Sequence, residues 1–487
     1  MNILFSHSYF LRFDPKQWET GQPYAPLGTL YAAALMRQKG HQVSLFDTMF
    51  VSDPDKVADK IALHRPELFV IYDDGFNYLT KMCLTNMRDA AFRMIRLAKD
   101  RGCKVVVSSS DSTDQFEKYL NEGADFVLIG EAEHTLLELT VAIEKGDTAF
   151  SSIRGIAFRQ DDNLIKTQRR NVIHDLDNLP MPAWDLADIE TYRGYWMKSS
   201  GYFSMNIGTT RGCPFKCNWC AKPIYGNRYN SRSPRNVVDE LKFLKEKYNF
   251  DHIWFCDDIF GLKPGWVNEF ANIVKEEKLS FRFKIQSRAD LLLQENNIKA
   301  LALAGCENVW IGAESGSQKI LDAMDKGITI AQIKDATLLL KKNGIHPSFF
   351  IQFGYLGETK EDIRKTITMI NGLLPYSIGV SVSYPLPGTL FYDKVRADLQ
   401  EKTNWTDSDE LKLMFKNTYQ PSFYKQLHRY VQKNHRLHIA IDHTKKILQR
   451  PLTPKAIKKT LSILYYFPAV LMARIKLTTL EKHLNYE

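Results

Sequence analysis

Three cysteines lie close together near the middle of this 487-residue chain, at positions 213, 217 and 220. They belong to a segment that begins at Arg211 and reads RGCPFKCNWCA, so their spacing is C-x3-C-x2-C. A [4Fe–4S] cluster is normally held by four thiolates, one for each iron. Three thiolates therefore leave one iron open to a small molecule. The spacing predicts an iron–sulfur cluster held by Cys213, Cys217 and Cys220.

Two other uses of these cysteines, a zinc site and disulfides, are less favoured. A zinc site needs a fourth Cys or His at ligand spacing, and the next such residues, His252 and Cys256, make no recognised zinc pairing. Disulfides are disfavoured because the chain has seven cysteines, an odd number, and begins without the features of a secretory signal. The cluster is the favoured interpretation.

Composition bounds the class of protein. Hydrophobic residues make up 44% of the chain and charged residues 25%, as in soluble globular proteins. The length favours two or three domains. The cysteine content suits a reducing cytoplasm, and there is no run of 18 apolar residues, so we expect a cytoplasmic protein without a transmembrane helix.

Residues 1–150 alternate predicted strands and helices. The five predicted strands are Ile3–His7, Val43–Asp47, Leu68–Tyr72, Val105–Ser108 and Phe126–Ile129. Strands that are apolar on both faces and separated by helices indicate a five-stranded, doubly wound parallel sheet, for which we expect a flavodoxin-like strand order. Ligands of such sheets bind at the carboxyl ends of the strands.

Residues 151–200 are predicted to form a connector, with a hairpin from Ile156 to Thr167 and a proline-rich run from Leu179 to Trp184. Residues 201–390 alternate again. The predicted strands are Phe203–Thr209, His252–Cys256, Arg282–Gln286, Asn308–Ala313, Ser348–Phe353 and Gly379–Tyr384. Six strand–helix units predict a partial (β/α)6 TIM barrel, whose chemistry lies at the carboxyl ends of its strands. The cysteine segment follows the first of these strands.

Several further segments occur in an order shared with a known family. They are PLGTLYAAA from Pro26, GADFVLIGEAE from Gly123, DNLPMPAWD from Asp177, DDIF from Asp257, GAESGS from Gly312 and PLPGT from Pro385. With the cysteine segment, residues from about 25 to 390 resemble the cobalamin-binding-domain radical S-adenosylmethionine proteins. That family includes methyltransferases and the anaerobic magnesium-protoporphyrin ester cyclase. In it, the open iron chelates S-adenosylmethionine, and one-electron reduction cleaves this cofactor to a 5′-deoxyadenosyl radical.

The resemblance implies a set of residues that contact S-adenosylmethionine. Asp257 and Asp258, after the second barrel strand, are expected near its amino group, and Arg288 near its carboxylate. Glu314 is expected at the ribose hydroxyls, and Gly354 is expected to let the backbone approach adenine. Ion pairs at the barrel rim, or an ordinary turn for Gly354, are the competing interpretations.

The resemblance also implies cobalamin at the N-terminal sheet. The sequence lacks the Asp-x-His-x-x-Gly motif that supplies a histidine to cobalt, so the strongest signature is absent. The expected contacts are Ser109 and Ser110 after the fourth strand, and Gly130 and Glu131 after the fifth. A sheet that only docks the barrel is the alternative, since fold does not fix function.

The implied reaction is methylation of an unactivated carbon in a small-molecule or lipid-like substrate. Radical oxidative cyclisation, as in the ester cyclase, uses the same two modules, and a sensor that only holds the cofactors is a third possibility. A radical enzyme also needs an electron donor such as flavodoxin or ferredoxin.

The C-terminal region, residues 391–487, is predicted to be helical and basic. From Phe423 to Glu487 there are 13 Lys or Arg against three acidic residues, so this segment carries the chain's net charge of +9. The apolar stretch Leu461–Ile475 lies among lysines, which suits contact with an anionic membrane surface. A helical cap that packs on the barrel is the competing interpretation, and binding of nucleic acid is disfavoured because no RNA-binding module is recognisable.

Overall fold

The computed structural model describes residues 1–487 except 83, 221–223, 295, 400–401, 448–453 and 483–487. The chain divides into two compact units. The first comprises residues 1–214, 221–285 and 404–410, and the second comprises residues 215–220, 286–403 and 411–487.

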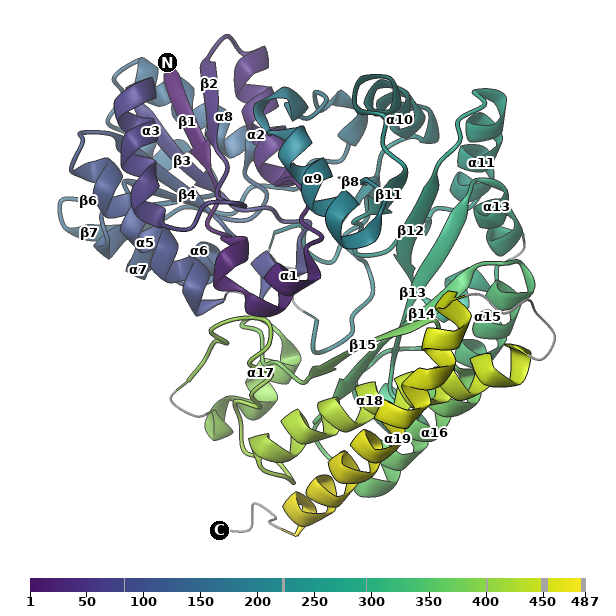
Figure 1. The fold of residues 1–487 in the computed structure, drawn as a ribbon. Helices are drawn as coiled ribbons and strands as arrows, with labels where there is room; N and C mark the ends of the chain where they lie inside the picture. The colour runs from purple at the N-terminus through teal and green to yellow at the C-terminus, as the bar shows by residue number, and fades with distance from the viewer. Residues whose placement is uncertain (83, 221–223, 295, 400–401, 448–453, 483–487) are drawn as a thin grey trace. The chain divides into compact units, whose positions relative to one another are not determined.

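The N-terminal sheet has seven strands in the order β2-β1-β3-β4-β5-β6-β7 (Figure 1). They are β1 Asn2–Ser6, β2 Gln42–Phe46, β3 Leu68–Tyr72, β4 Lys104–Ser108, β5 Phe126–Leu128, β6 Ile156–Gln160 and β7 Asn163–Lys166. The first five are parallel, which confirms the predicted flavodoxin-like order. The predicted hairpin is β6–β7, and it pairs antiparallel with β5, so it extends the sheet beyond the five strands that the sequence predicted. Its buried Ile156 and Phe158 explain this pairing.

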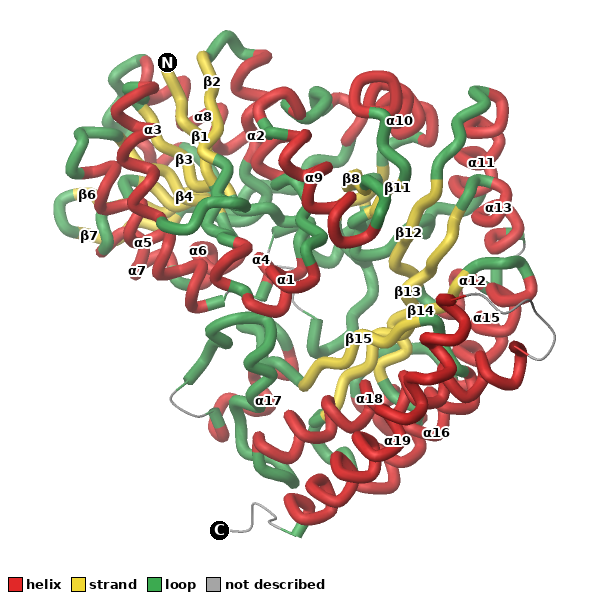
Figure 2. Tube along the Cα trace, viewed as in Figure 1, coloured by secondary structure: helices red, strands yellow, loops and turns green. Residues whose placement is uncertain are grey.

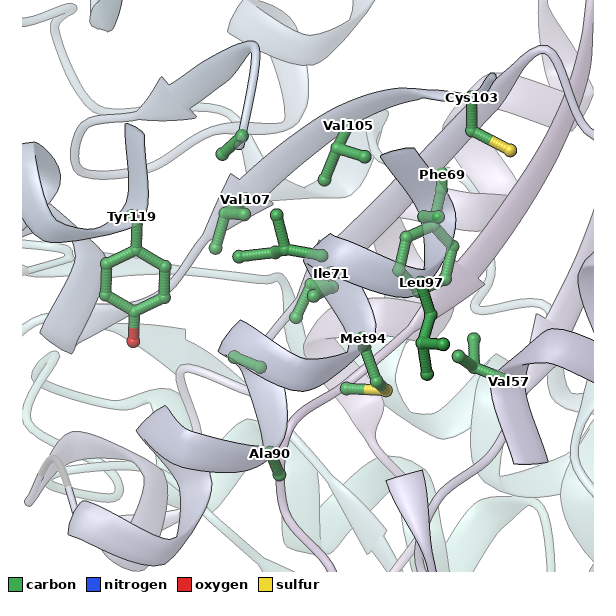
Figure 3. Close-up of a cluster of buried hydrophobic side chains, with 14 of the residues drawn as sticks. Val57, Phe69, Ile71, Ala90, Met94, Leu97, Cys103, Val105, Val107 and Tyr119 are labelled. Atoms are coloured by element: carbon green, nitrogen blue, oxygen red, sulfur yellow. The ribbon is translucent and has the colours of Figure 1, made fainter. Parts of the chain in front are cut away.

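Helices cover both faces of this sheet. The helices of the first unit are α1 Pro15–Thr20, α2 Leu27–Gln38, α3 Val57–His64, α4 Tyr78–Lys81, α5 Thr85–Lys99, α6 Ser110–Asp114, α7 Phe116–Asn121, α8 Glu133–Glu144, α9 Ile189–Ser200, α10 Pro234–Tyr248 and α11 Trp266–Glu276. One core joins the strands to α3, α5 and α7 (Figure 3). A second core joins the other face to α2 and α8. The sheet is therefore doubly wound, as predicted.

Helix α9 lies in the segment that the sequence predicted to be a connector. Asp188 caps its N-terminus by accepting a hydrogen bond from the backbone N–H of Thr191, and Gly201 ends it in the left-handed conformation. Tyr192 and Trp196 are buried. The sequence did not predict this helix, because its segment has few apolar residues and follows a proline-rich run.

The second sheet has six parallel strands in the order β15-β14-β13-β12-β11-β8 (Figure 2). They are β8 Ser204–Ile207, β11 His252–Phe255, β12 Arg282–Ser287, β13 Cys306–Glu314, β14 His346–Phe353 and β15 Ser377–Val382. All six predicted barrel strands are present. The antiparallel pair β9 Thr210–Arg211 and β10 Asn230–Ser231 was not predicted, because strands of two residues carry no periodicity.

Helices of the second unit follow the predicted βα alternation. They are α12 Ala289–Leu292, α13 Asn297–Leu303, α14 Gln318–Ala323, α15 Ile330–Lys342, α16 Lys360–Leu373, α17 Leu390–Val395, α18 Pro421–Ile447 and α19 Pro454–Glu481. Capping boxes at Thr329 and Thr359 fix the starts of α15 and α16. The long helices α18 and α19 confirm the predicted helical C-terminal region (Figure 1).

Candidate functional site

The three predicted cluster cysteines share one loop, which leaves the carboxyl end of β8 and is bracketed by the β9–β10 pair. Cys213, Cys217 and Cys220 are half-buried, and all six cysteines that the structure describes are reduced thiols. Within the described part of the chain, no three His, Cys, Asp or Glu side chains gather closely enough to hold a metal ion.

Glycine is required at the entrance to this loop. Gly212 has φ +79°, and a Cβ atom there would lie 2.3 Å from the carbonyl oxygen of Arg228. Any other residue would displace the backbone at Arg228, just before β10. The turn before Cys213 is therefore set by the backbone itself.

Asp257 is hydrogen-bonded to the backbone that leads into this loop. Its Oδ1 accepts hydrogen bonds from the backbone N–H groups of Thr209 (2.7 Å) and Thr210 (2.8 Å), and its Oδ2 bonds the hydroxyl of Thr209. The side chain is fully buried, and burial raises the pKa of Asp257 to about 7 despite these bonds. Its oxygens are thus used to position the loop, whereas the neighbouring Asp258 is exposed and pairs with Lys81 at 2.5 Å.

Arg211 is the buried centre of an ion cluster within the first unit. Its guanidinium lies 2.5 Å from Glu131, after β5, and 2.8 Å from Glu133, at the start of α8. Although burial opposes ionisation, the two carboxylates hold the pKa of Arg211 well above its usual value. Glu131, predicted as a cobalamin contact, also accepts a hydrogen bond from the backbone N–H of Ile173. Its carboxylate thus ties the sheet edge to the cysteine loop, a role that the sequence did not reveal.

The second half of the loop is anchored by Asn218. Its side chain donates to the carbonyl of Ala323 and to Asp325, and accepts from the hydroxyl of Tyr355. Its backbone N–H donates to the carbonyl of Met324. These contacts fix the residue between Cys217 and Trp219.

Glu314 is bound by a lysine that the sequence analysis missed. Lys326 is buried and its Nζ lies 2.7 Å from Glu314 Oε1. Burial lowers the pKa of Lys326, but the Glu314 carboxylate and the nearby Cys217 raise it above its usual value, so the amine is charged. The ammonium faces the ring of Trp219 at 5.8 Å. This lysine therefore places a positive charge beside Cys217 and the ring of Trp219.

Arg288 also serves the loop. It stacks on the ring of Phe215 at 3.7 Å, donates to the backbone carbonyls of Lys326 and Gly327, and pairs with Asp290. Four of its five N–H donors are thereby used inside the second unit. The guanidinium supports both the cysteine loop and the turn that carries Lys326.

Gly354 has its backbone fully bonded within the chain. Its N–H donates to Glu358 Oε2 at 2.7 Å and its carbonyl accepts from Asn417. It has φ +78°, and a Cβ there would press on Leu413 and Tyr424 at 3.2 Å. Gly354 is therefore needed for a close approach to these side chains, and no bound adenine is required to explain it.

The buried carboxyl group of Glu358 should make the free energy of unfolding depend on pH. Burial raises its pKa to about 8, and Oε1 has no hydrogen-bond partner within the described residues. Because the folded protein binds this proton more tightly than the unfolded chain, the free energy of unfolding falls as pH rises from about 4.5 to about 8, by at most about 1.4 kcal/mol per pH unit. Glu358→Gln is expected to flatten this decline, measured by urea unfolding at several pH values. Asp257, raised in the same direction, leaves a residual slope.

Glu361→Gln is the matched control, because Glu361 is exposed and pairs only with Arg364 across one helical turn among the contacts described here. Its pH profile is expected to follow that of the unmodified chain. A Glu358→Gln profile as steep as that of the control would contradict the assignment of a buried proton to Glu358.

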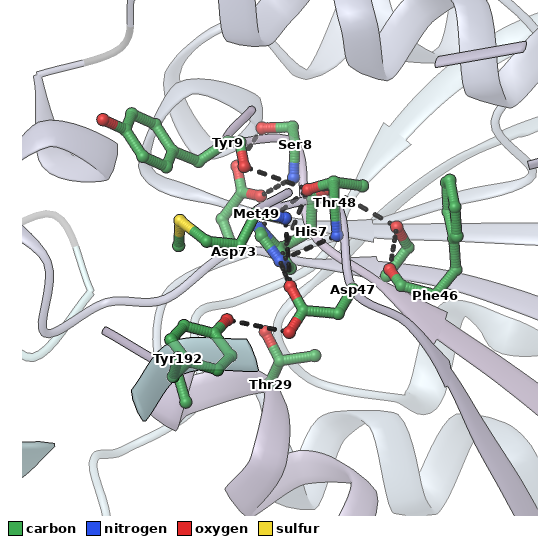
Figure 4. A network of polar contacts seen from close by, with 12 residues as sticks. His7, Ser8, Tyr9, Thr29, Phe46, Asp47, Thr48, Met49, Asp73 and Tyr192 are labelled. Atoms are coloured by element: carbon green, nitrogen blue, oxygen red, sulfur yellow. Dashed lines mark hydrogen bonds and ion pairs between the residues drawn. The ribbon is translucent and has the colours of Figure 1, made fainter. Parts of the chain in front are cut away.

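The carboxyl edge of the N-terminal sheet carries a polar network (Figure 4). His7, after β1, bonds Asp47 at 2.9 Å, and Asp47 also accepts from the hydroxyl of Tyr192. Ser8 donates twice to Asp73, after β3. Sequence reasoning missed this network because its members lie far apart along the chain. It fixes the loops after β1, β2 and β3 relative to one another.

The predicted cobalamin contacts after β4 and β5 lie at this same edge. Ser109 caps α6 through reciprocal hydrogen bonds with Ser112, and both Ser109 and Ser110 are buried. Gly130 has φ +82°, and a Cβ there would lie 2.6 Å from Arg169 Nε. The structure therefore brings Ser109, Ser110, Gly130 and Glu131 to one sheet edge, as expected for strands β4 and β5.

Comparison with known proteins supports the resemblance inferred from the sequence. Residues 207–370 match the Radical SAM superfamily. An uncharacterised methyltransferase of Pyrococcus horikoshii is 29% identical over 78% of this chain and 80% of its own length. The anaerobic magnesium-protoporphyrin IX monomethyl ester cyclase of Rubrivivax gelatinosus is 26% identical over 83% of this chain and 72% of its own.

Two solved structures share the fold. The cobalamin-dependent S-adenosylmethionine radical enzyme OxsB, with aqua-cobalamin bound, has a TM-score of 0.73 and 15% identity, covering 98% of this chain and 72% of that one. The radical S-adenosylmethionine methyltransferase TsrM of Kitasatospora setae, with cobalamin and a [4Fe-4S] cluster, has a TM-score of 0.67 and 18% identity, covering 81% and 74%. Both structures hold cobalamin, and the TsrM structure also holds a [4Fe-4S] cluster. Residues 207–370 thus form a Radical SAM domain, and the chain as a whole has the fold of the cobalamin-dependent radical S-adenosylmethionine enzymes.

Proposed function

We propose that this protein is a cobalamin-dependent radical S-adenosylmethionine methyltransferase that acts on an unactivated carbon of a small-molecule or lipid-like substrate. The observation that carries the proposal is the three-cysteine loop at the carboxyl end of β8, in a chain whose N-terminal sheet has the flavodoxin-like order. In this proposal residues 1–150 form the domain that binds cobalamin, and residues 201–390 form the partial barrel that carries out the radical chemistry.

The donor set of the loop fits a [4Fe–4S] cluster. Cys213, Cys217 and Cys220 supply three reduced thiols, and Lys326 places a positive charge near Cys217. The indole Nε1 of Trp219 is buried without a hydrogen-bond partner in the described structure, so a donor is available beside these thiols. The bound cluster would supply the electron that cleaves S-adenosylmethionine to a radical.

The residues expected to contact S-adenosylmethionine differ in the contacts that they make within the chain. Asp258 is exposed and already pairs with the ammonium of Lys81, so its carboxylate suits an ammonium group, as the resemblance implies. Asp257, Arg288 and Glu314 use their polar atoms within the chain, and we assign them to positioning the loop. Gly354 is likewise assigned to packing.

The sheet edge suits cobalamin by residue type. Ser109 and Ser110 are small and polar, and Gly130 has no side chain, as suits residues that follow β4 and β5 at a ligand-binding edge. When bound, cobalamin would carry the methyl group. With Asp-x-His-x-x-Gly absent from the sequence, we assign no residue as a ligand to cobalt.

The proposal includes a cytoplasmic location and an electron donor such as flavodoxin or ferredoxin. Oxidative cyclisation is the second candidate, favoured by the similarity to the ester cyclase over most of both chains. A cofactor-holding sensor is disfavoured by Asp258 and the three-thiol spacing, which indicate a pocket for S-adenosylmethionine.

Anaerobic reconstitution with iron, sulfide and hydroxocobalamin tests the cofactors directly. We expect about four irons and one cobalt per chain after desalting. Incubation of the reduced protein with S-adenosylmethionine should then yield 5′-deoxyadenosine. Iron without cobalt would overturn the cobalamin assignment, and intact cofactors without 5′-deoxyadenosine would favour the sensor.

A further inference from the structure

Helix α19 exposes a long apolar face within the second unit. The side chains that form this face are Leu461, Leu464, Phe467, Leu471, Met472 and Ile475, each between 54% and 75% exposed. At 3.6 residues per turn they follow one side of the helix over about four turns. Exposed apolar patches of this kind mark a surface that meets a partner or a membrane.

The opposite face of α19 is attached to α18 (Figure 1). Ala473 is buried, and its carbonyl accepts a hydrogen bond from Gln426 of α18 at 2.9 Å. The hydroxyls of Thr444 and Thr460 join the same two helices, and Glu481 pairs with Lys360 at 2.8 Å. The apolar face therefore points away from the helix on which α19 packs.

Helix α18 is in turn bonded to the sheet and to the end of α16. Gln432 donates to the carbonyl of Ile378 in β15, His435 bonds the carbonyl of Pro375, and Asn434 bonds Asn371. The α18–α19 pair is thus a fixed part of the second unit.

Basic side chains border the apolar face. On the helical circumference Lys458 and Lys476 lie at one edge of the face and Arg474 lies at the other, and all three are exposed. Residues 454–482 contain a single acidic residue, Glu481, which is paired with Lys360. An apolar face between two basic edges matches a bilayer surface, where the apolar side chains enter the acyl boundary and the cations reach anionic headgroups.

The segment Ile457–Glu481 is also long and apolar enough to cross a membrane by length and composition, and only 6% of its most apolar stretch is buried. Crossing would require α19 to leave α18, whose polar and charged side chains cannot follow it into hydrocarbon. We propose that α19 lies flat on an anionic membrane surface and docks the protein there while it stays packed on α18. This proposal does not depend on the chemistry proposed above, and its test uses no cofactor signal.

The test is co-sedimentation of the full chain with phosphatidylcholine vesicles, with and without phosphatidylglycerol. We expect binding to the anionic vesicles at about 50 mM salt and its loss at about 500 mM, with little binding to neutral vesicles. Lys458→Gln/Arg474→Gln/Lys476→Gln should weaken binding by about a hundredfold. Leu464→Ser/Leu471→Ser should weaken it at least about tenfold.

Leu303→Ser/Leu338→Ser is the matched control, since both leucines are exposed, at 56% and 50%, on α13 and α15. It should bind like the unmodified chain. Three outcomes would overturn the proposal: no binding to anionic vesicles at low salt, equal loss in the control variant, or resistance of the cellular protein to alkaline carbonate extraction, which indicates a spanning helix. Concentration-dependent self-association without vesicle binding would assign the face to a second copy instead.

Discussion

Cys217→Ser is expected to abolish cleavage of S-adenosylmethionine and to lower iron binding far below the content of the unmodified protein. Cys217 is one of three thiols in the loop after β8, and a cluster that lacks one of three protein ligands is not retained. A serine hydroxyl is not ionised at neutral pH, so it does not replace the cysteine thiolate as a ligand to iron. We expect formation of 5′-deoxyadenosine to fall by at least about a thousandfold, and the same result for Cys213→Ser and Cys220→Ser. Iron analysis and product assay after anaerobic reconstitution measure both effects.

Cys103→Ser is the control for this series. Cys103 is buried in the N-terminal unit and its thiol contacts the carbonyl of Pro66, a bond that serine can also make. This variant should bind iron and form product like the unmodified protein. A Cys217→Ser protein that keeps its iron and activity would remove Cys217 from the cluster.

Arg211→Met is expected to give the largest loss of folding stability among single substitutions near the loop. It leaves the buried carboxylates of Glu131 and Glu133 without their cation, and removal of one partner from a buried ion pair costs about 3–5 kcal/mol. Urea unfolding measures the change. Burial raises the pKa of Glu131 even beside Arg211, so in this variant Glu131 should take up a proton on folding, and stability should fall as pH rises through the range in which it ionises.

Two further variants separate the ion cluster from a general effect of the substitution. Arg235→Met removes an exposed arginine that pairs with Glu277, and surface pairs contribute little. Combining Arg211→Met with Glu131→Gln and Glu133→Gln removes all the charges and should recover part of the lost stability. If Arg211→Met unfolds at the same urea concentration as Arg235→Met, the cluster is not a structural centre of the first unit.

The effect on the cysteine loop is a separate readout. Arg211 directly precedes Gly212 and Cys213, so loss of its anchor should loosen the start of the loop. Below the unfolding transition, reconstituted Arg211→Met is expected to bind less iron than Arg235→Met. This outcome would assign Arg211 to positioning the loop as well as to stability.

Much of this protein was readable from sequence because the signals are local. The C-x3-C-x2-C spacing lies within eight residues, so it needs no tertiary information. The strands Leu68–Tyr72 and His252–Phe255 were predicted to within a residue, because each is a short apolar run between helical segments. Alternation of strands and helices implied parallel sheets, and the chain order then constrained their topology.

The partners of the polar residues were decided by tertiary structure alone. Glu131 and Glu314 were expected to contact cofactors because the family resemblance implies those contacts. The fold brings Arg211 to Glu131 across 80 residues and Lys326 to Glu314 across a turn after α14, so that both carboxylates are neutralised within the chain. The pairing of β6 with β5 was likewise set by contacts that no local pattern encodes. Sequence determined which chemistry the loop offers, and packing determined which side chains support that loop, because a buried charge is stable only beside the partner that the whole fold supplies.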